Sequence, residues 1–399
     1  MSAAPRPLPL GLRMINRVGP MVERSGILTT ELDPDALCAL AVQRSGLTDF
    51  GDPSFRPALE RLLDSVQTDA RLHFLGRRFM HQVVLRALEV RLRLAARAPE
   101  ADALPLRPPL VICGLPRSGT TFLHRLLALA DDAQALPLWE LMEPVAGPGP
   151  DRRRVEAERR MARLARVVPH SIDAQHLMRA DLPDECGHLF KPAFLSSLLW
   201  MVPATGWLEW MHHQDFGPAY ADYRRLLALL ARPDRRLVLK DPFHAMHLPA
   251  LFSAVPDARV VQTHRAPSEV VPSFHKLCLT LHAVFAEDLD LQRIVTANTD
   301  WLAHLAQRSV DDRVLVPAGQ VLDVDYRDLV RDPVDTCRRI HAHFGLPFDE
   351  ALEARMQAFV AENGQRKHGP NPYSAEDYGQ TTAGIGARFQ DYRSTYGLD

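Results

Sequence analysis

The chain has 399 residues, of which 46% are hydrophobic and 24% charged, and its formal net charge is −2. This composition is typical of a globular protein with a sizeable core, and the charge balance argues against a general nucleic-acid-binding protein. Five cysteines without C-x-x-C spacing predict reduced thiols rather than a disulfide framework or a zinc site. No uninterrupted apolar stretch reaches the roughly 20 residues that a membrane span needs, so we expect no span and a cytoplasmic location.

The first hundred residues are expected to be helical. Asp33 and Pro34 open a segment with an acidic first turn, and apolar residues recur at helical spacing over residues 55–66 and 70–97. We therefore expect a helical N-terminal region at 1–104, followed by a main domain at 105–399. The proline-rich segment 99–109 is the expected linker between them.

From residue 110 the pattern changes to short apolar strands that alternate with helices, which is typical of a parallel sheet in an α/β fold. Strands are expected at 110–113, 237–239 and 258–265, and within 314–324. Helices are expected after each of them, beginning near residues 118, 247, 268 and 334. The tail at 364–379 is rich in glycine, proline and polar residues and predicts a long loop, with a short helix near 386–396.

A phosphate-binding loop is predicted between the first strand and its helix. The segment GLPRSGTT at 114–121 has the glycine spacing of a P-loop, but Thr120 stands where a nucleoside triphosphatase has lysine. Backbone N–H groups and the positive end of the helix dipole favour an anion at such a junction. Because Arg117 adds a positive charge from within the loop, we expect a phosphate site without machinery for a γ-phosphate.

Cationic groups recur where the predicted strands end. Ligands of an open parallel sheet bind at the carboxyl ends of its strands. The loop at 114–121, Lys240 and Arg265 follow three strands, and a shared anion site explains all three better than separate surface roles. Ser273, about two helical turns beyond Arg265, can join that arginine at a second phosphate.

These motifs resemble those of sulfotransferases that use 3′-phosphoadenosine 5′-phosphosulfate (PAPS), in a bacterial branch with a helical N-terminal region. The loop at 114–121 resembles that family's site for the 5′-phosphosulfate, and VVQTHRAP at 260–267 with Ser273 resembles its 3′-phosphate motif. LKDP at 239–242 resembles the strand-end lysine of the tyrosyl-protein branch. DYRDLVRDP at 325–333 and FGLP at 344–347 resemble later family elements.

The resemblance implies a three-layer P-loop-like domain with a central parallel sheet. It also implies transfer of a sulfuryl group from PAPS to a hydroxyl, or less favourably an amine, by in-line attack. Adenosine 3′,5′-bisphosphate would leave, and no metal would be required. Lys240 and Arg117 would stabilise the charge on the leaving group. The implied donor-binding residues are Arg117, Ser118, Gly119, Thr120, Thr121, Arg265, Ser273, Arg366 and Lys367.

A general base must accept the proton of the acceptor. Glu140 is the favoured candidate, because burial beside Trp139 can raise its pKa from about 4.3. Its alternative role is a carboxylate that interacts with a helix dipole. His176 and Glu185 stay open as rival bases.

The acceptor is expected to be a hydrophobic small molecule. Aromatic residues cluster in the segment 190–210 and are candidates for an apolar pocket; core packing is the default role of such residues, and only their clustering favours the pocket. A homodimer also stays open.

Two other functions remain open from the sequence. A P-loop nucleotide kinase or related phosphotransferase would share the fold, but the loop lacks its lysine and no Mg²⁺-binding aspartate stands out. A non-catalytic nucleotide-binding module would bind the donor product without transfer. A serine hydrolase is excluded, because Ser118 is not in a Gly-x-Ser-x-Gly elbow.

Overall fold

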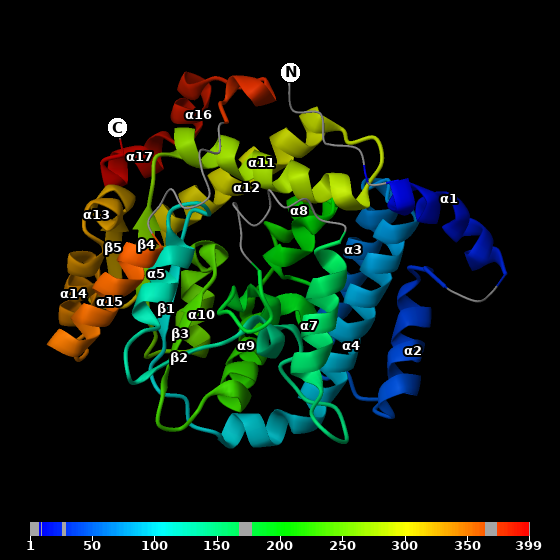
Figure 1. The fold of residues 1–399 in the computed structure, drawn as a ribbon, viewed down its shortest axis with the longest axis horizontal. Coiled ribbons are helices and arrows are strands. Elements are labelled where there is room, and N and C mark those ends of the chain that lie inside the picture. Colours follow the sequence, from blue (N-terminus) through cyan, green and yellow to red (C-terminus); the bar gives the residue numbers. More distant parts are fainter. Residues whose placement is uncertain (1–7, 9, 26–28, 167–177, 364–372, 399) are drawn as a thin grey trace.

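A central parallel sheet organises the molecule, and the computed structural model describes residues 8, 10–25, 29–166, 178–363 and 373–398 (Figure 1). The five strands are β1 (Leu110–Gly114), β2 (Ala133–Ala135), β3 (Arg236–Lys240), β4 (Arg259–His264) and β5 (Val321–Asp325). Their order is β2-β3-β1-β4-β5, and every pair is parallel. The predicted α/β class and all four expected strands are confirmed; the three-residue strand β2 was not expected.

Strand β1 lies at the centre of the sheet. Leu110 is paired with Val238 of β3 on one side and with Arg259 of β4 on the other. Strands β1 and β3 are buried along their whole length, which explains the apolar sequence of β1 and the apolar centre of β3 between Arg236 and Lys240. Because β3, β1 and β4 are neighbours and parallel, the three segments that follow them meet at one edge of the sheet.

Four helices form the N-terminal region: α1 (Leu10–Arg24), α2 (Pro34–Ser45), α3 (Phe55–Thr68) and α4 (Phe74–Ala103). The side chain of Asp33 caps α2 by accepting a hydrogen bond from the N–H of Ala36. Helix α4 continues through Pro99, so the expectation that the linker begins at 99 was wrong. The last turns of α4 are rich in alanine, whose helix propensity is high, and the linker begins only at Leu104.

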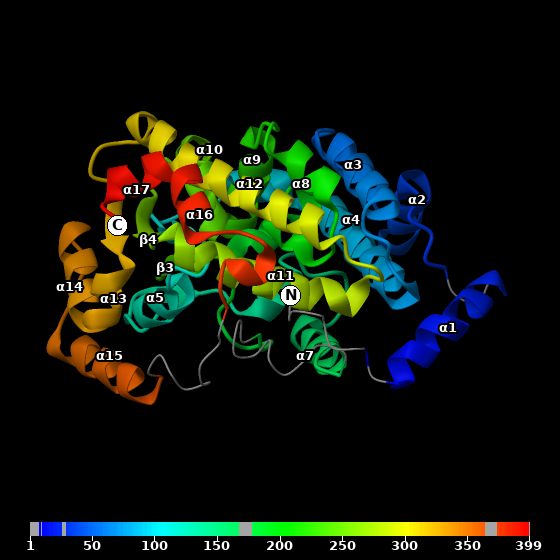
Figure 2. The same cartoon turned by 90° about the horizontal axis from the view of Figure 1, so that it is seen from above.

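The chain continues with these α-helices: α5 (Thr120–Leu127), α6 (Leu138–Met142), α7 (Arg153–Leu164), α8 (Thr205–Met211), α9 (Gly217–Leu230), α10 (Leu248–Ala254), α11 (Pro267–Phe285), α12 (Leu291–Asp311), α13 (Tyr326–Arg331), α14 (Pro333–His343), α15 (Glu350–Glu362), α16 (Thr382–Arg388) and α17 (Gln390–Tyr396). The 3₁₀ helices used below are η2 (Cys186–Ala193) and η4 (Pro242–Met246). Seen from above, α13–α15 lie at one end of the molecule and α1–α4 at the other (Figure 2).

The N-terminal helices and the sheet share one hydrophobic core. Leu88 of α4, Leu226 of α9 and Val111 of β1 belong to the same buried cluster. Helix α4 also buries Arg91, whose guanidinium forms an ion pair with Asp222 of α9 at 3.1 Å. Because α4 is so deeply packed, we expect the N-terminal region to fold together with the sheet.

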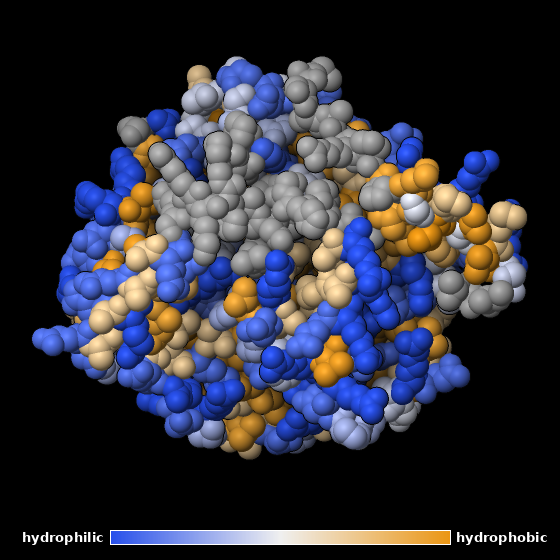
Figure 3. Space-filling view, viewed as in Figure 1, coloured by the Kyte–Doolittle hydropathy of each residue, from blue (hydrophilic) through white to orange (hydrophobic). Residues whose placement is uncertain are grey.

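Helix α1 differs from the others in what it exposes. Leu10, Met14, Val18 and Met21 are exposed along it and form the orange patch at the upper right of Figure 3.

In the part of the chain that the structure describes, no helix combines the length and apolarity needed to cross a membrane. All five cysteines are free.

Candidate active site

The loop after β1 is held tightly against β4. Gly114 has a φ of 131°, and a Cβ atom there would lie 2.2 Å from the carbonyl oxygen of Thr263, so only glycine fits. Ser118 is fully buried; its hydroxyl donates to the carbonyl of Leu115 and lies 2.6 Å from the Thr263 hydroxyl. Gly119, with a φ of 83°, leads directly into α5. The shape of the loop is therefore fixed from within, and the first-turn N–H groups of α5 are left for a ligand.

The loop and the predicted 3′-phosphate motif meet directly. Nε of Arg117 donates to the hydroxyl of Ser273 at 3.2 Å, and Ser273 lies buried in α11. Nη1 of Arg265 donates to the carbonyl oxygen of Arg117 at 2.8 Å. Burial lowers the pKa of Arg117, as expected for a cation withdrawn from water. The structure thus brings Arg117, Arg265 and Ser273 together, whereas Thr120 and Thr121 begin α5 beside them.

Tyr326 is a residue of this site that the sequence did not single out. The guanidinium of Arg265 lies 4.3 Å from the centre of the Tyr326 ring, in a cation–π arrangement. A Cβ atom on Gly119 would lie 3.2 Å from the same ring. Tyr326 therefore packs between the loop and Arg265, while the exposed Glu269 pairs with Arg265 at 2.6 Å.

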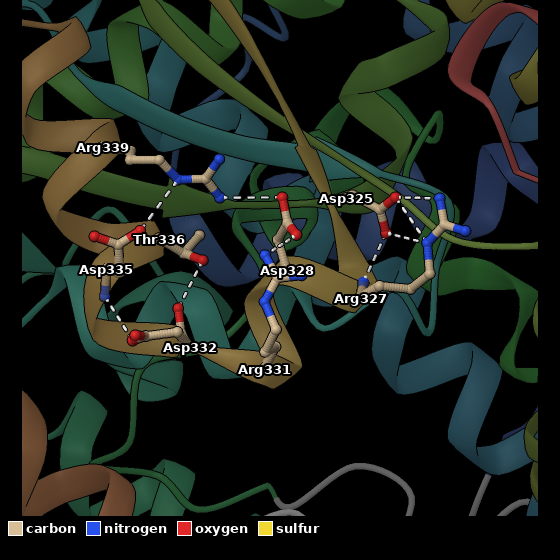
Figure 4. A network of polar contacts seen from close by, with 8 residues as sticks. All are labelled: Asp325, Arg327, Asp328, Arg331, Asp332, Asp335, Thr336 and Arg339. Atoms are coloured by element: carbon tan, nitrogen blue, oxygen red, sulfur yellow. Dashed lines mark hydrogen bonds and ion pairs between the residues drawn. The ribbon is translucent and has the colours of Figure 1, made fainter.

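A network of charged residues positions Tyr326 at the start of α13. The carboxylate of Asp325 accepts a hydrogen bond from the N–H of Arg327 at 2.7 Å and so caps α13. Asp332 caps α14 in the same way, accepting from the N–H of Asp335 at 2.9 Å. These caps belong to the network drawn in Figure 4, which comprises Asp325, Arg327, Asp328, Arg331, Asp332, Asp335, Thr336 and Arg339. The segment 325–333 thus has a structural role beside the site.

Strand β3 ends in a buried ion pair. Lys240 is 0% exposed, and its Nζ donates to Oε1 of Glu185 at 2.6 Å. The side chain of Glu185 is 13% exposed. The segment before Glu185 runs beside the start of α6, where the N–H of Leu138 donates to the carbonyl of Leu182 at 2.9 Å. This backbone contact tethers Glu185 at the end of β3.

Asp241 adds a second carboxyl group beside this pair. Its carboxylate accepts from the N–H of Phe243 at 3.1 Å, and a Cβ atom on Gly187 would lie 2.1 Å from its Oδ2. Burial, and next the charge of Glu185, raise the pKa of Asp241 to about 8. At neutral pH Asp241 is therefore mainly protonated.

Glu140, the favoured base, lies half-buried in α6. Burial raises its pKa, the direction suggested by the sequence, while the charges of Arg153 and Arg232 oppose the shift. The cations nearest Glu140 are Arg153 and Arg232, whereas Glu185 forms an ion pair with Lys240. Three predicted residues lie outside the described part of the chain: His176, Arg366 and Lys367.

The aromatic segment expected to line an acceptor pocket divides between core and cavity. Phe194 and Trp207 are fully buried, and Nε1 of Trp207 donates to the carbonyl of Phe194 at 3.2 Å, so both pack in the core. Phe190 instead contributes to an aromatic cavity next to the strand end. Other residues that line this cavity are Leu195, Tyr220, Asp241, Phe243, His244, His247 and Trp301. Among the residues that the structure describes, no group of three or more metal-ligating side chains is placed to hold a metal ion.

Known proteins share sequence with this chain. The model of a family described as "Sulfotransferase family" matches residues 108–350. Two curated proteins named omega-hydroxy-beta-dihydromenaquinone-9 sulfotransferase Stf3, from Mycobacterium bovis and Mycobacterium tuberculosis, are each 25% identical to the chain over 150 residues. That match covers 36% of this chain and 38% of the length of each relative.

Solved structures share the fold over almost the whole chain. Sulfotransferase STF1 from Mycobacterium tuberculosis H37Rv is 30% identical, covers 90% of this chain and 98% of its own, and gives a TM-score of 0.74. Sulfotransferase STF9 from Mycobacterium avium is 25% identical, covers 93% of this chain and 98% of its own, and gives a TM-score of 0.81. With such coverage, the likeness includes the N-terminal helices as well as the sheet.

Proposed function

Since the chain belongs to the sulfotransferase family, we propose that it transfers a sulfuryl group from PAPS to a hydroxyl of a hydrophobic small molecule. The observation that carries this proposal is the convergence of the 114–121 loop, Arg117, Arg265 and Ser273 beside the Lys240–Glu185 pair. A loop that cradles an anion next to a second cationic site suits a donor with phosphates at its 5′ and 3′ positions. An amine acceptor is the less favoured alternative.

The donor is proposed to lie across the carboxyl ends of β3, β1 and β4. Thr120 and Thr121 offer their backbone N–H groups to the 5′-phosphosulfate, together with Gly119. Ser118 contributes its N–H, because its hydroxyl already bonds within the loop. Arg265 and Ser273 would hold the 3′-phosphate, which can replace the exposed carboxylate that now pairs with Arg265. We keep Arg366 and Lys367 as proposed donor contacts.

The proposed reaction is a single in-line displacement. The acceptor oxygen forms a bond to sulfur while the bond between sulfur and the 5′-phosphate oxygen breaks, and adenosine 3′,5′-bisphosphate leaves. Lys240 and Arg117 stabilise the negative charge that develops on the leaving oxygen. The proton of the acceptor hydroxyl passes to a protein carboxylate.

Glu185 is our preferred carboxylate for that proton, ahead of Glu140. It lies at the end of β3 within hydrogen-bond distance of Lys240. When the ammonium of Lys240 turns to the leaving phosphate, the carboxylate of Glu185 loses that hydrogen bond and is available to accept the proton. We expect Glu185→Gln to lower kcat by at least about 100-fold, and Glu140→Gln to keep a rate and pH profile near those of the wild type. The reverse result would restore Glu140 as the base.

The function itself is tested with donor labelled in its sulfuryl group. We expect radiolabel from ³⁵S-PAPS to appear on at least one member of a panel of phenols, sterols and terminal alcohols of lipids. Titration with ATP and Mg²⁺ is the matched control, and we expect binding of adenosine 3′,5′-bisphosphate but not of ATP–Mg²⁺. Binding of the bisphosphate without transfer to any acceptor would point to a non-catalytic module instead.

A further inference from the structure

A second cavity is lined by other residues of η2 and is here called the basic cavity. It is bounded by α4, the end of α6, α7 and η2, and has an empty volume of about 450 Å³. Its lining residues are Val83, Arg86, Ala87, Val90, Met142, Pro144, Arg160, His188, Lys191 and Pro192. The walls are thus mostly apolar, with three side chains that can carry positive charge besides His188.

Helix α4 supplies one wall and one of these cations. Val83, Arg86, Ala87 and Val90 follow the spacing that places residues on a single helix face. Among the described residues, Arg86 has no hydrogen-bond or ion-pair partner. Burial, and next the charge of Arg160, lower the pKa of Arg86 to about 10. A guanidinium that is partly withdrawn from water and lies beside another cation favours an anionic ligand.

The other two cations are only partly balanced. Nζ of Lys191 lies 2.8 Å from Nδ1 of His188, which is a ring nitrogen and not a carboxylate. Burial lowers the pKa of Lys191 to about 8, while the charges of Asp184 and Arg160 act in opposite directions. Arg160 has two carboxylate partners, Glu143 and Glu156. The residues that line the cavity themselves include three cations and no carboxylate.

The helix η2 connects this cavity with the proposed base. Side chains three residues apart eclipse one another on a 3₁₀ helix, so His188 and Lys191 lie along one face of η2, and Glu185 precedes them as the extended N-cap residue. Glu185 immediately precedes η2 and contacts Lys240. Six residues at a rise of about 2 Å each place the backbones of Glu185 and Lys191 roughly 12 Å apart.

We propose that the basic cavity binds an anionic group of the acceptor, namely a carboxylate, sulfate or phosphate, through Lys191, Arg86 and Arg160. The inference rests on the proposed function, and it describes the acceptor as an amphiphile with a hydroxyl and an anionic group roughly 12 Å apart. The apolar lining would contact the chain between those two groups. Helix α4, and with it the N-terminal region, then takes part in selecting the acceptor.

The test is binding without donor, measured by isothermal titration with ω-hydroxy fatty acids of increasing chain length and with their methyl esters. We expect the wild-type protein to bind an acid of matching length at least about tenfold more tightly than its ester. Lys191→Met and Arg86→Met should each remove that preference and leave the affinity for the ester unchanged. Arg154→Met changes an exposed arginine of α7 that does not line the cavity, and should keep the preference.

Charge-retaining variants keep the inference testable if a neutral variant fails to fold. If Lys191→Met or Arg86→Met unfolds, Lys191→Arg and Arg86→Lys should keep the preference for the acid. Equal affinity for acid and ester would overturn the inference. A preference that survives the loss of both cations would also overturn it, as would an acid that does not bind at millimolar concentration.

This inference and the proposed function can fail separately. Transfer of label to neutral alcohols, with no preference for the acids, would leave the function intact and remove the role of the basic cavity. Binding selective for the acids, with no transfer to any acceptor, would leave the cavity as an anion site and remove the function.

Discussion

Replacing one partner of the Lys240–Glu185 pair should destabilise the protein unequally, depending on which partner is lost. Glu185→Gln leaves an ammonium that is 0% exposed without its carboxylate. Breaking a buried ion pair in this way costs about 3–5 kcal/mol. Lys240→Met instead leaves Glu185, which is 13% exposed and can be hydrated, so its cost should be smaller. The double variant replaces both charges by neutral groups and should be more stable than Glu185→Gln alone.

Asp241 makes the cost of Glu185→Gln dependent on pH. Glu185→Gln removes the repulsion from Glu185, but burial, the larger cause, still raises the pKa of Asp241. At pH 6 Asp241 is therefore more protonated than at pH 9 and replaces the missing carboxylate less well. At pH 9 it is ionised and can face the ammonium of Lys240. The loss of stability should therefore be larger at pH 6 than at pH 9. Urea unfolding followed by circular dichroism at both pH values measures the difference, provided that the m-value does not change.

An exposed ion pair provides the control for this experiment. Arg331 is 76% exposed and pairs with Asp328, and Arg331→Met should change the free energy of unfolding by less than about 1 kcal/mol. The reasoning is refuted if Lys240→Met costs as much as Glu185→Gln at pH 6. It is equally refuted if Glu185→Gln stays within about 0.5 kcal/mol of the wild type at that pH.

Three further outcomes are expected. Arg265→Ala should weaken binding of adenosine 3′,5′-bisphosphate by about 10- to 100-fold in a calorimetric titration, whereas Arg331→Ala should leave it unchanged. Gly114→Ala should lower the free energy of unfolding in urea by at least about 3 kcal/mol, because the new Cβ would meet a strand carbonyl. Gly149→Ala is the control, since φ is also positive there but the space is open, and it should cost clearly less. Equal costs would exclude the steric reason. Asp241 stays protonated in the folded state up to about pH 8 but ionises near pH 4 when the chain is unfolded. The free energy of unfolding should therefore fall by up to about 1.4 kcal/mol per pH unit as the pH rises between these values. Asp241→Asn should remove that slope, and an unchanged slope would contradict the assignment.

Much of the fold could be predicted because its strands are short apolar runs bounded by turn residues. The four expected strands have this pattern, whereas β2 has only the sequence Ala-Gln-Ala and no apolar run. The end of α4 was placed too early because a proline normally ends a helix, yet Pro99 lies within the last turns of α4. The alanines on both sides of Pro99 have a high helix propensity, and in these last turns that preference outweighs the proline.

The cationic half of the site followed from one topological rule, because Lys240 and Arg265 come directly after buried strands. The carboxylates and the aromatic contact did not follow from it. Glu185 reaches Lys240 only because an irregular segment lies beside α6, and Tyr326 meets Arg265 only after α13 has packed on the loop. Such contacts depend on tertiary positions that residue spacing does not encode.

The central position of β1 has a consequence for the order in which the chain can fold during synthesis. Leu110 cannot pair on one side until Val238 has been synthesised, and on the other side until Arg259 has been synthesised. At 5–20 residues per second, the ribosome needs roughly 8–30 s to supply the roughly 150 residues between Leu110 and Arg259. During most of that time, until Val238 is made, the apolar β1 strand lacks both neighbours and is exposed to aggregation or chaperone binding. Nascent chains that stop before β4 should therefore accumulate in the insoluble fraction.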